Sequence, residues 1–239
     1  MLAIGAHPDD VEIGCGATLA LLASQGRSVG ILHLTAGEAG TRGTPERRRE
    51  EATAAAAALG VSELAFLDCG DGGLRQGRQE EDWVIEVLRS WRPELVLGPP
   101  PRDRHPDHGR AHDLVRDAFF YAGLGKRLPD TAGSPHRSSA LFSYMGHDPL
   151  PPTFIVDVTS TWEQKRSALQ AYESQLHQPG AEELLTPATK ISSPEFLLAL
   201  EGRDRHAGML IGATYGESFV SAGPLSVTSP WHLVSGDLR

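Results

Sequence analysis

The sequence predicts an α/β fold, with a doubly wound, mostly parallel sheet and helices on both of its faces. Two observations support this prediction. Short apolar runs alternate with helical patterns through the first hundred residues, and the connections between them are short. This β-α-β alternation is typical of parallel sheets with right-handed crossovers. In addition, loops rich in His and Asp follow two of the apolar runs, at the sheet edge where ligands collect in such folds.

The helices of the first half have recognisable ends. The first stops at Gly26, a residue that readily adopts a left-handed conformation. Thr44 and Pro45 have the residue types of an N-cap and a first helical position, and Pro93 breaks the third helix. The expected strands are 2–5, 28–35, 63–67 and 94–98, and the expected helices are 10–25, 45–59 and 80–91.

The second half is less regular, and no linker separates it from the first. Expected there are helices at 107–121, 159–175 and 194–208, strands at 140–144 and 153–158, an irregular loop at 177–193, and loop or short strands from 215 onward. We therefore predict a single domain over 1–239. Residues 1–125 form a Rossmann-like core with the polar loops, and residues 126–239 form a cap that completes the sheet and shapes the substrate pocket.

The composition restricts the class of function. A formal charge of −9 over 239 residues argues against non-specific nucleic-acid binding, which requires clustered Lys and Arg. No apolar run reaches the roughly eighteen residues of a membrane span. The two cysteines, Cys15 and Cys69, lack metal-type spacing, which favours a reduced, cytoplasmic protein. We expect a small-molecule substrate as the partner, and a homo-oligomer is possible.

The first polar loop is Ala6-His7-Pro8-Asp9-Asp10, directly after the first strand. A His and an Asp in so short a loop can chelate a divalent cation, and the second Asp is left for proton transfer. The alternative is that one Asp caps the following helix and His7 is an ordinary polar residue.

The second polar loop follows the fourth strand and carries His105, Asp107 and His108. The first and fourth strands of doubly wound sheets are commonly neighbours, so the two loops should face each other. His7, Asp10 and His108 would then supply two nitrogens and one oxygen, the pattern of a catalytic zinc site with an open position. Adjacent helical residues project roughly 100° apart, so Asp9 and Asp10 do not easily share one ion. The spacing does not decide which of them binds it.

These two loops resemble those of the LmbE-like (PIG-L) zinc-dependent N-deacetylases. Arg48 in Arg48-Arg49-Glu50-Glu51 matches an element of the same family. The segments 171–175, 193–197 and 215–219 are similar to its bacillithiol-biosynthesis branch. The resemblance extends over most of the chain.

The resemblance implies a role for each matched residue. His7, Asp10 and His108 become ligands of one Zn²⁺ per chain, with Fe²⁺ as the other possible metal. Asp9 becomes the general base and His105 stabilises the transition state. Arg48, His147 and Asp107 are counted as substrate-binding residues, Asp107 also being a possible N-cap that orients a His. The family's oxyanion-donating Tyr has no clear match: Phe196 stands near one such position, and Tyr144, His147 and Tyr215 are the candidates.

The implied reaction is metal-dependent hydrolysis of an N-acetyl group from an N-acetylglucosaminyl conjugate, with N-acetylglucosaminyl malate as the expected substrate. Arg48 could pair with the malate carboxylate, or simply with Glu51 on its own helix. Another N-acetyl amino sugar is an alternative substrate. A metal-dependent phosphoesterase and a non-catalytic binding module are the alternative functions.

Overall fold

The computed structural model describes residues 1–128, 133–177 and 189–229. Its centre is one sheet of seven strands in the order β3-β2-β1-β4-β5-β7-β6. The strands are β1 (Leu2–Gly5), β2 (Gly30–His33), β3 (Glu63–Phe66), β4 (Leu95–Gly98), β5 (Ala140–Tyr144), β6 (Phe154–Asp157) and β7 (Gly216–Ser221). The predicted α/β class is therefore confirmed, and strands from both halves of the chain belong to the same sheet.

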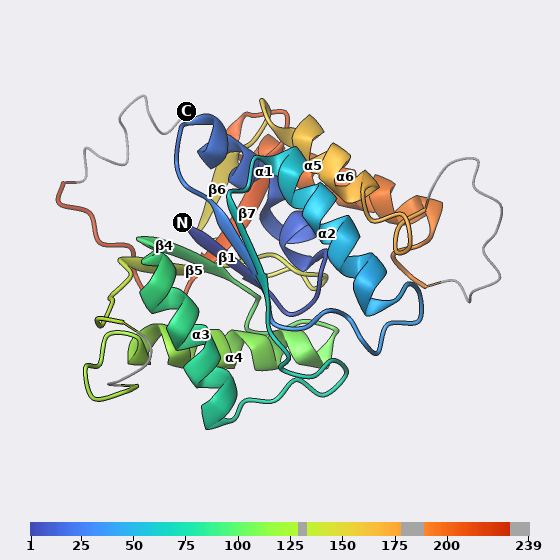
Figure 1. Cartoon of the computed structure of the whole chain (residues 1–239). Helices are drawn as coiled ribbons and strands as arrows, with labels where there is room; N and C mark the ends of the chain where they lie inside the picture. The colour runs from blue at the N-terminus through green and yellow to red at the C-terminus, as the bar shows by residue number, and fades with distance from the viewer. Residues whose placement is uncertain (129–132, 178–188, 230–239) are drawn as a thin grey trace.

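Helices cover both faces of this sheet, as Figure 1 shows, with α1, α2 and α5 on one side and α3 and α4 on the other. Each face encloses its own cluster of buried apolar side chains. The helices are α1 (Asp10–Ser24), α2 (Pro45–Leu59), α3 (Arg78–Trp91), α4 (Pro106–Tyr121), α5 (Trp162–Gln170) and α6 (Pro194–Ile211). None of the helices in the described residues has the length and hydropathy needed to cross a bilayer.

The predicted adjacency of the first and fourth strands is confirmed. β1 pairs in parallel with β2 on one side and with β4 on the other. Helices α1 and α4 follow these two strands, so the turns that begin both helices lie at the same edge of the sheet. The winding of the chain therefore brings together two loops that are about a hundred residues apart.

The last third departs from expectation at two places. The sequence suggests loop or short strands after residue 215, but β7 is a six-residue strand between β5 and β6, antiparallel to both. Helix α5 ends at Gln170 and not near 175, and turns continue to Tyr172 and Leu176, which are buried in the core. Most of the irregular loop predicted at 177–193 lies outside the described residues.

Helix α1 depends on β7 for its continuity. Cys15 has non-helical backbone angles, which interrupts the helix. The carboxylate of Glu217 in β7 accepts hydrogen bonds from the backbone N–H groups of Ala17 and Thr18 just beyond this break. The ammonium of Lys165 lies 2.7 Å from the same carboxylate and 2.8 Å from that of Asp204, so the buried charges are paired.

Candidate metal and catalytic site

The loop between β1 and α1 places His7, Asp9 and Asp10 at the carboxyl edge of the sheet. Asp9 has a φ of 100°, a conformation that costs a non-glycine residue on the order of 1–3 kcal/mol. Its side chain makes no capping hydrogen bond to α1, and Asp10 instead accepts one from the backbone N–H of His7. Asp9 thus occupies the N-cap position of α1, but the side-chain capping hydrogen bond expected in the alternative interpretation is absent.

The loop between β4 and α4 carries the other two histidines. His105 occupies the N-cap position, where its Nδ1 accepts a hydrogen bond from the backbone N–H of Asp107. The prediction of Asp107 as the N-cap is wrong, because Asp107 already lies inside the first turn. Its buried carboxylate accepts the N–H groups of Gly72 and Leu74 and so ties the loop after β3 to α4.

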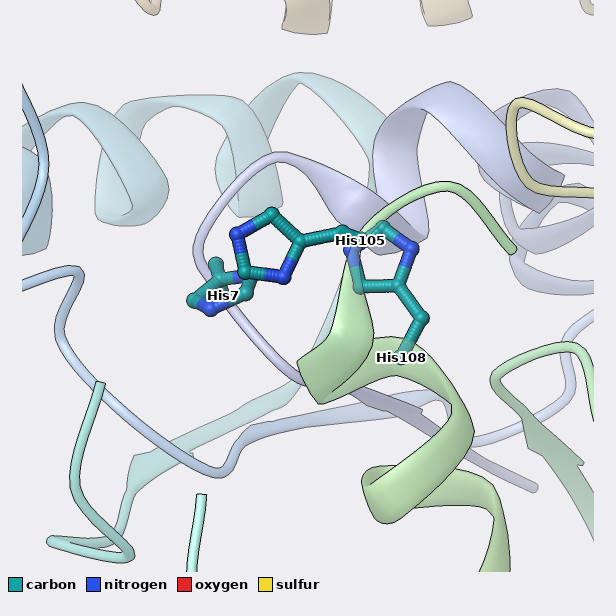
Figure 2. A group of neighbouring side chains, drawn as sticks. All are labelled: His7, His105 and His108. Carbon is teal, nitrogen blue, oxygen red and sulfur yellow. The ribbon is translucent and has the colours of Figure 1, made fainter. Parts of the chain in front are cut away.

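The two loops meet at the carboxylate of Asp10. Its Oδ2 lies 3.5 Å from Nδ1 of His7, and its Oδ1 lies 3.1 Å from Nε2 of His108. Figure 2 shows the rings of His7, His105 and His108 beside one another, the first from the loop after β1 and the others from the start of α4. Their donor atoms lie within 4.8 Å of one another. The three residues predicted as metal ligands, His7, Asp10 and His108, thus lie next to one another, although they come from two loops that are far apart in the sequence.

In both His7 and His108, the ring nitrogen that does not face Asp10 lies near another carboxylate. Nδ1 of His108 hydrogen-bonds to Asp103 at 2.8 Å. Nε2 of His7 lies 3.0 Å from Asp71 and 3.6 Å from Asp107, yet it is buried and makes no aligned hydrogen bond within the part of the chain that the structure describes. Histidines that bind metals usually have a carboxylate or carbonyl on their other ring nitrogen. Together with the mixed nitrogen and oxygen donors, this environment fits a divalent cation such as Zn²⁺.

Charge pairing holds these groups ionised. Burial opposes a charge on His108, but Asp10 and Asp103 outweigh it and raise the pKa of His108 to about 10. Burial also opposes a charge on His7, but the nearby carboxylates of Asp10, Asp107 and Asp71 outweigh it and raise the pKa of His7 well above its ordinary value. In turn, the two imidazoles hold the pKa of Asp10 well below its usual range despite its burial. A bound cation would displace one proton from each of these two charged histidines.

Asp9 has a different electrostatic environment from Asp10. Burial raises the pKa of Asp9 to about 6, although the neighbouring guanidinium of Arg48 opposes the shift. Arg48 lies 3.2 Å from Asp9, and its side chain is only 6% exposed. The approach depends on Gly37, whose φ is +73° and where a Cβ would lie 1.9 Å from Nη1 of Arg48. The suggested pairing of Arg48 with Glu51 is wrong, because Glu51 contacts Arg47 and Ser174 instead.

His105 is set up as a neutral hydrogen-bond donor. Burial and the neighbouring His7 and His108 lower its pKa below the ordinary value. Because its Nδ1 accepts the N–H of Asp107, the proton of the neutral ring belongs on Nε2. A neutral imidazole with a free N–H can stabilise developing negative charge on a substrate oxygen.

The other candidates lie in varied surroundings. His147 is exposed, and its backbone N–H donates to Asp103. Tyr144 is buried and its hydroxyl donates to the backbone carbonyl of Ile4, so it has no free donor for a substrate. Tyr215 stacks on Trp162 and its hydroxyl bonds to α6. Neither tyrosine is placed as an oxyanion donor.

Sequence reasoning overlooked two carboxylates. Neither Asp71 nor Asp103 is among the site residues that the sequence analysis singles out. Both are nearly buried beside a predicted ligand, at 7% and 0% exposure of the side chain. The signal available for Asp103 was its place in the loop after the fourth strand, five residues before His108.

The fold and site define a class: an α/β domain in which His7, His105 and His108 form a group that could hold a metal ion at the carboxyl edge of the sheet, next to the buried carboxylate of Asp9. The family model "PIG-L: GlcNAc-PI de-N-acetylase" matches residues 2–119. The chain belongs to this PIG-L family, as its relatives also show.

Two relatives differ in activity. The chain is 36% identical over 188 residues to a diacetylchitobiose deacetylase of Thermococcus kodakarensis, covering 73% of this chain and 69% of the relative. It is 31% identical over 196 residues to a 4-oxalmesaconate hydratase of Pseudomonas putida, covering 74% of each. Among solved structures, a conserved protein of Thermus thermophilus has a TM-score of 0.85 at 37% identity, covering 96% of this chain and 97% of the other.

Proposed function

We propose that the protein is a metal-dependent deacetylase that hydrolyses the acetamide of an N-acetyl amino sugar. The observation that carries this proposal is the convergence of His7 and His108 on Asp10, with Asp9 adjacent and buried. The family membership and the deacetylase relative support the same reaction class.

His7, Asp10 and His108 would hold the ion. Zinc bound by three protein groups would lower the pKa of a water molecule and polarise the amide carbonyl. Because Nε2 of His7 faces Asp71, we assign the inward Nδ1 of His7 as the ligand atom, together with Nε2 of His108. Fe²⁺ is also compatible with this donor set.

Asp9 is the proposed general base. Its pKa of about 6 leaves it ionised near neutral pH yet basic enough to accept a proton from the attacking water. The N–H at Nε2 of His105 would donate a hydrogen bond to the oxyanion. When the carbon–nitrogen bond breaks, the proton held by Asp9 passes to the departing amine, so the products are acetate and the free amino sugar.

For the substrate we propose N-acetylglucosaminyl malate, on the resemblance to the bacillithiol branch. The relative from Thermococcus kodakarensis carries the name of an N-acetylated sugar as its substrate. His147 contacts Lys190, which would add a cation suited to an anionic aglycone. Arg48 is almost fully buried against Asp9 and Pro8, so we propose that it acts on this substrate through Asp9 and not by direct contact.

The test is a screen of N-acetylglucosaminides for release of a primary amine, with a fluorogenic amine reagent. N-acetylglucosaminyl malate, diacetylchitobiose and free N-acetylglucosamine form the panel, each with and without a chelator. We expect chelator-sensitive release, fastest with the malate conjugate. Absence of amine from every substrate at full zinc occupancy would contradict the proposal.

A second candidate is hydration of a carbon–carbon double bond in an unsaturated polycarboxylate, because a relative at 31% identity is named a hydratase. The same ion could polarise a conjugated carbonyl while Asp9 activates water. This activity consumes a conjugated chromophore and releases no amine. Loss of ultraviolet absorbance by 4-oxalmesaconate, without any amine release from the sugar panel, would favour the hydratase.

A further inference from the structure

We propose that Asp103 is a positioning residue for His108, and that the backbone at Gly146 and His147 holds its carboxylate in place. This assignment rests on the proposed function, because it gives Asp103 a role toward a metal ion bound by His108. It adds a support from the segment that follows β5, outside the two loops that carry the ligands.

The contact between Asp103 and His108 fixes which ring nitrogen faces the site. Oδ2 of Asp103 lies 2.8 Å from Nδ1 of His108, while Nε2 on the other edge of the ring faces Asp10. A neutral imidazole that binds metal through Nε2 must carry its proton on Nδ1. The Asp103 carboxylate accepts that proton in a hydrogen bond, and therefore selects both the tautomer and the ring orientation.

The carboxylate itself has little freedom to move. Its Oδ2 accepts a second hydrogen bond from the backbone N–H of His147 at 2.9 Å, and its Oδ1 accepts one from the N–H of Arg104. The Asp103 side chain is 0% exposed. Among the described residues, this buried carboxylate forms its ion pair with His108. A buried charge without a partner is costly, so the pairing stabilises the His108 ring in its position beside Asp103.

Gly146 provides the space that the carboxylate occupies. A Cβ at this position would lie 1.8 Å from Oδ2 and 2.9 Å from Cγ of Asp103. Gly146 is not among the glycines with positive φ, so its backbone conformation is open to alanine. An alanine here would therefore displace Asp103, and it would also bring a Cβ to 3.0 Å from Cγ of Pro100. The variant is a second probe of the contact between Asp103 and His108, from a residue outside the pair.

The experiment compares Asp103→Ala, Asp103→Asn and Gly146→Ala with the unaltered protein. Asp148→Asn is the carboxylate control, because Asp148 contacts the His147 side chain and not His108. Gly202→Ala is the glycine control, because no atom of the described residues lies within 4 Å of its added Cβ. Zinc affinity is measured by competition with a chromogenic chelator. The visible absorption of the Co²⁺-substituted proteins reports the geometry of the ligands, and thermal denaturation reports folding.

We expect Asp103→Ala to bind zinc about 10–100-fold more weakly, with an altered Co²⁺ spectrum. Asp103→Asn and Gly146→Ala should shift both readouts in the same direction by less, and the two controls should match the unaltered protein. If Asp103→Ala fails to fold, Asp103→Asn and Gly146→Ala decide the question by the same readouts.

The outcomes separate two failures. If the unaltered protein binds no zinc and no Co²⁺, the proposed metal-dependent function fails. If it binds both, and every folded Asp103 and Gly146 variant has the same affinity and spectrum, the metal site stands and the positioning role of Asp103 is overturned.

Discussion

The guanidinium of Arg48 and the carboxylate of Asp9 form a buried pair 3.2 Å apart, and Arg48 also donates to the backbone carbonyl of Pro8. Arg48 thus contacts the loop that carries the proposed base as well as the base itself. Because Arg48 is buried against Asp9, we expect it to orient the proposed base, whereas the sequence suggested a direct contact with substrate.

Replacement of Arg48 by alanine should lower kcat for all N-acetyl sugars by a similar factor, on the order of 10²-fold, because a misplaced base reacts poorly. Rates on N-acetylglucosaminyl malate and free N-acetylglucosamine provide the measurement, and the exposed Arg49→Ala is the matched control. A selective rise in KM for the malate conjugate would restore the substrate-contact role of Arg48.

Replacement of Asp9 by asparagine should preserve metal binding and lower kcat by about 10²–10⁴-fold, because the base is lost while the ligands remain. Metal analysis of the purified variant and a turnover assay test this together. Asp10→Asn and His108→Ala should instead lose the metal. If Asp9→Asn loses it and Asp10→Asn retains it, the roles of the two aspartates are exchanged.

Binding of zinc should release about two protons near pH 7. Before metal binds, the pKa of His108 is about 10 and that of His7 is also raised well above its ordinary value. Both rings are therefore positively charged at pH 7, with a proton on each ring nitrogen. Metal ligands must be neutral imidazoles, so zinc affinity rises with pH. Calorimetric titrations with zinc in buffers of different ionisation enthalpy count the protons. Identical enthalpies in all buffers would contradict the charged state of these rings.

Acid should weaken the fold through His33. This ring is buried against the backbone carbonyl of His7, and burial lowers its pKa from 6.5 to about 3. Between those values the unfolded chain binds a proton that the folded chain does not, so the contribution of His33 to the free energy of unfolding falls as pH decreases, by at most about 1.4 kcal/mol per pH unit. In urea titrations at pH 7.5 and 5.5, the change in the free energy of unfolding on acidification should therefore be less unfavourable in His33→Leu than in the unaltered protein. An unchanged dependence would exclude this contribution.

The sequence predicted the core of the fold because its signals are local. Apolar runs, Pro45 at a helix start and Gly26 after a helix end mark elements regardless of distant contacts. The place of β7 was not predictable in this way, since its pairing with β5 and β6 is a non-local choice. The early end of α5 likewise reflects tertiary packing of the turns around Tyr172.

For the site, sequence spacing brought His7 and Asp10 to the same sheet edge as His108, and the structure places them in contact. Their roles as metal ligands stay predictions. The residues that surround these ligands could not be predicted from the sequence, because the hydrogen bond of Asp103 with the backbone of His147 joins residues 44 apart. The partner of Arg48 was also hidden, because helical spacing favours Glu51 and only the folded loop brings Asp9 close.

The hydrogen bonds from Ala17 and Thr18 to Glu217 span 200 and 199 residues. During translation, both histidine loops emerge from the ribosome before Glu217 does. At that stage helix α1, which follows the loop of His7, still lacks the carboxylate that accepts its backbone N–H groups. We therefore expect the proposed cation site to mature only after residue 217 leaves the ribosomal exit tunnel, well after both histidine loops have emerged.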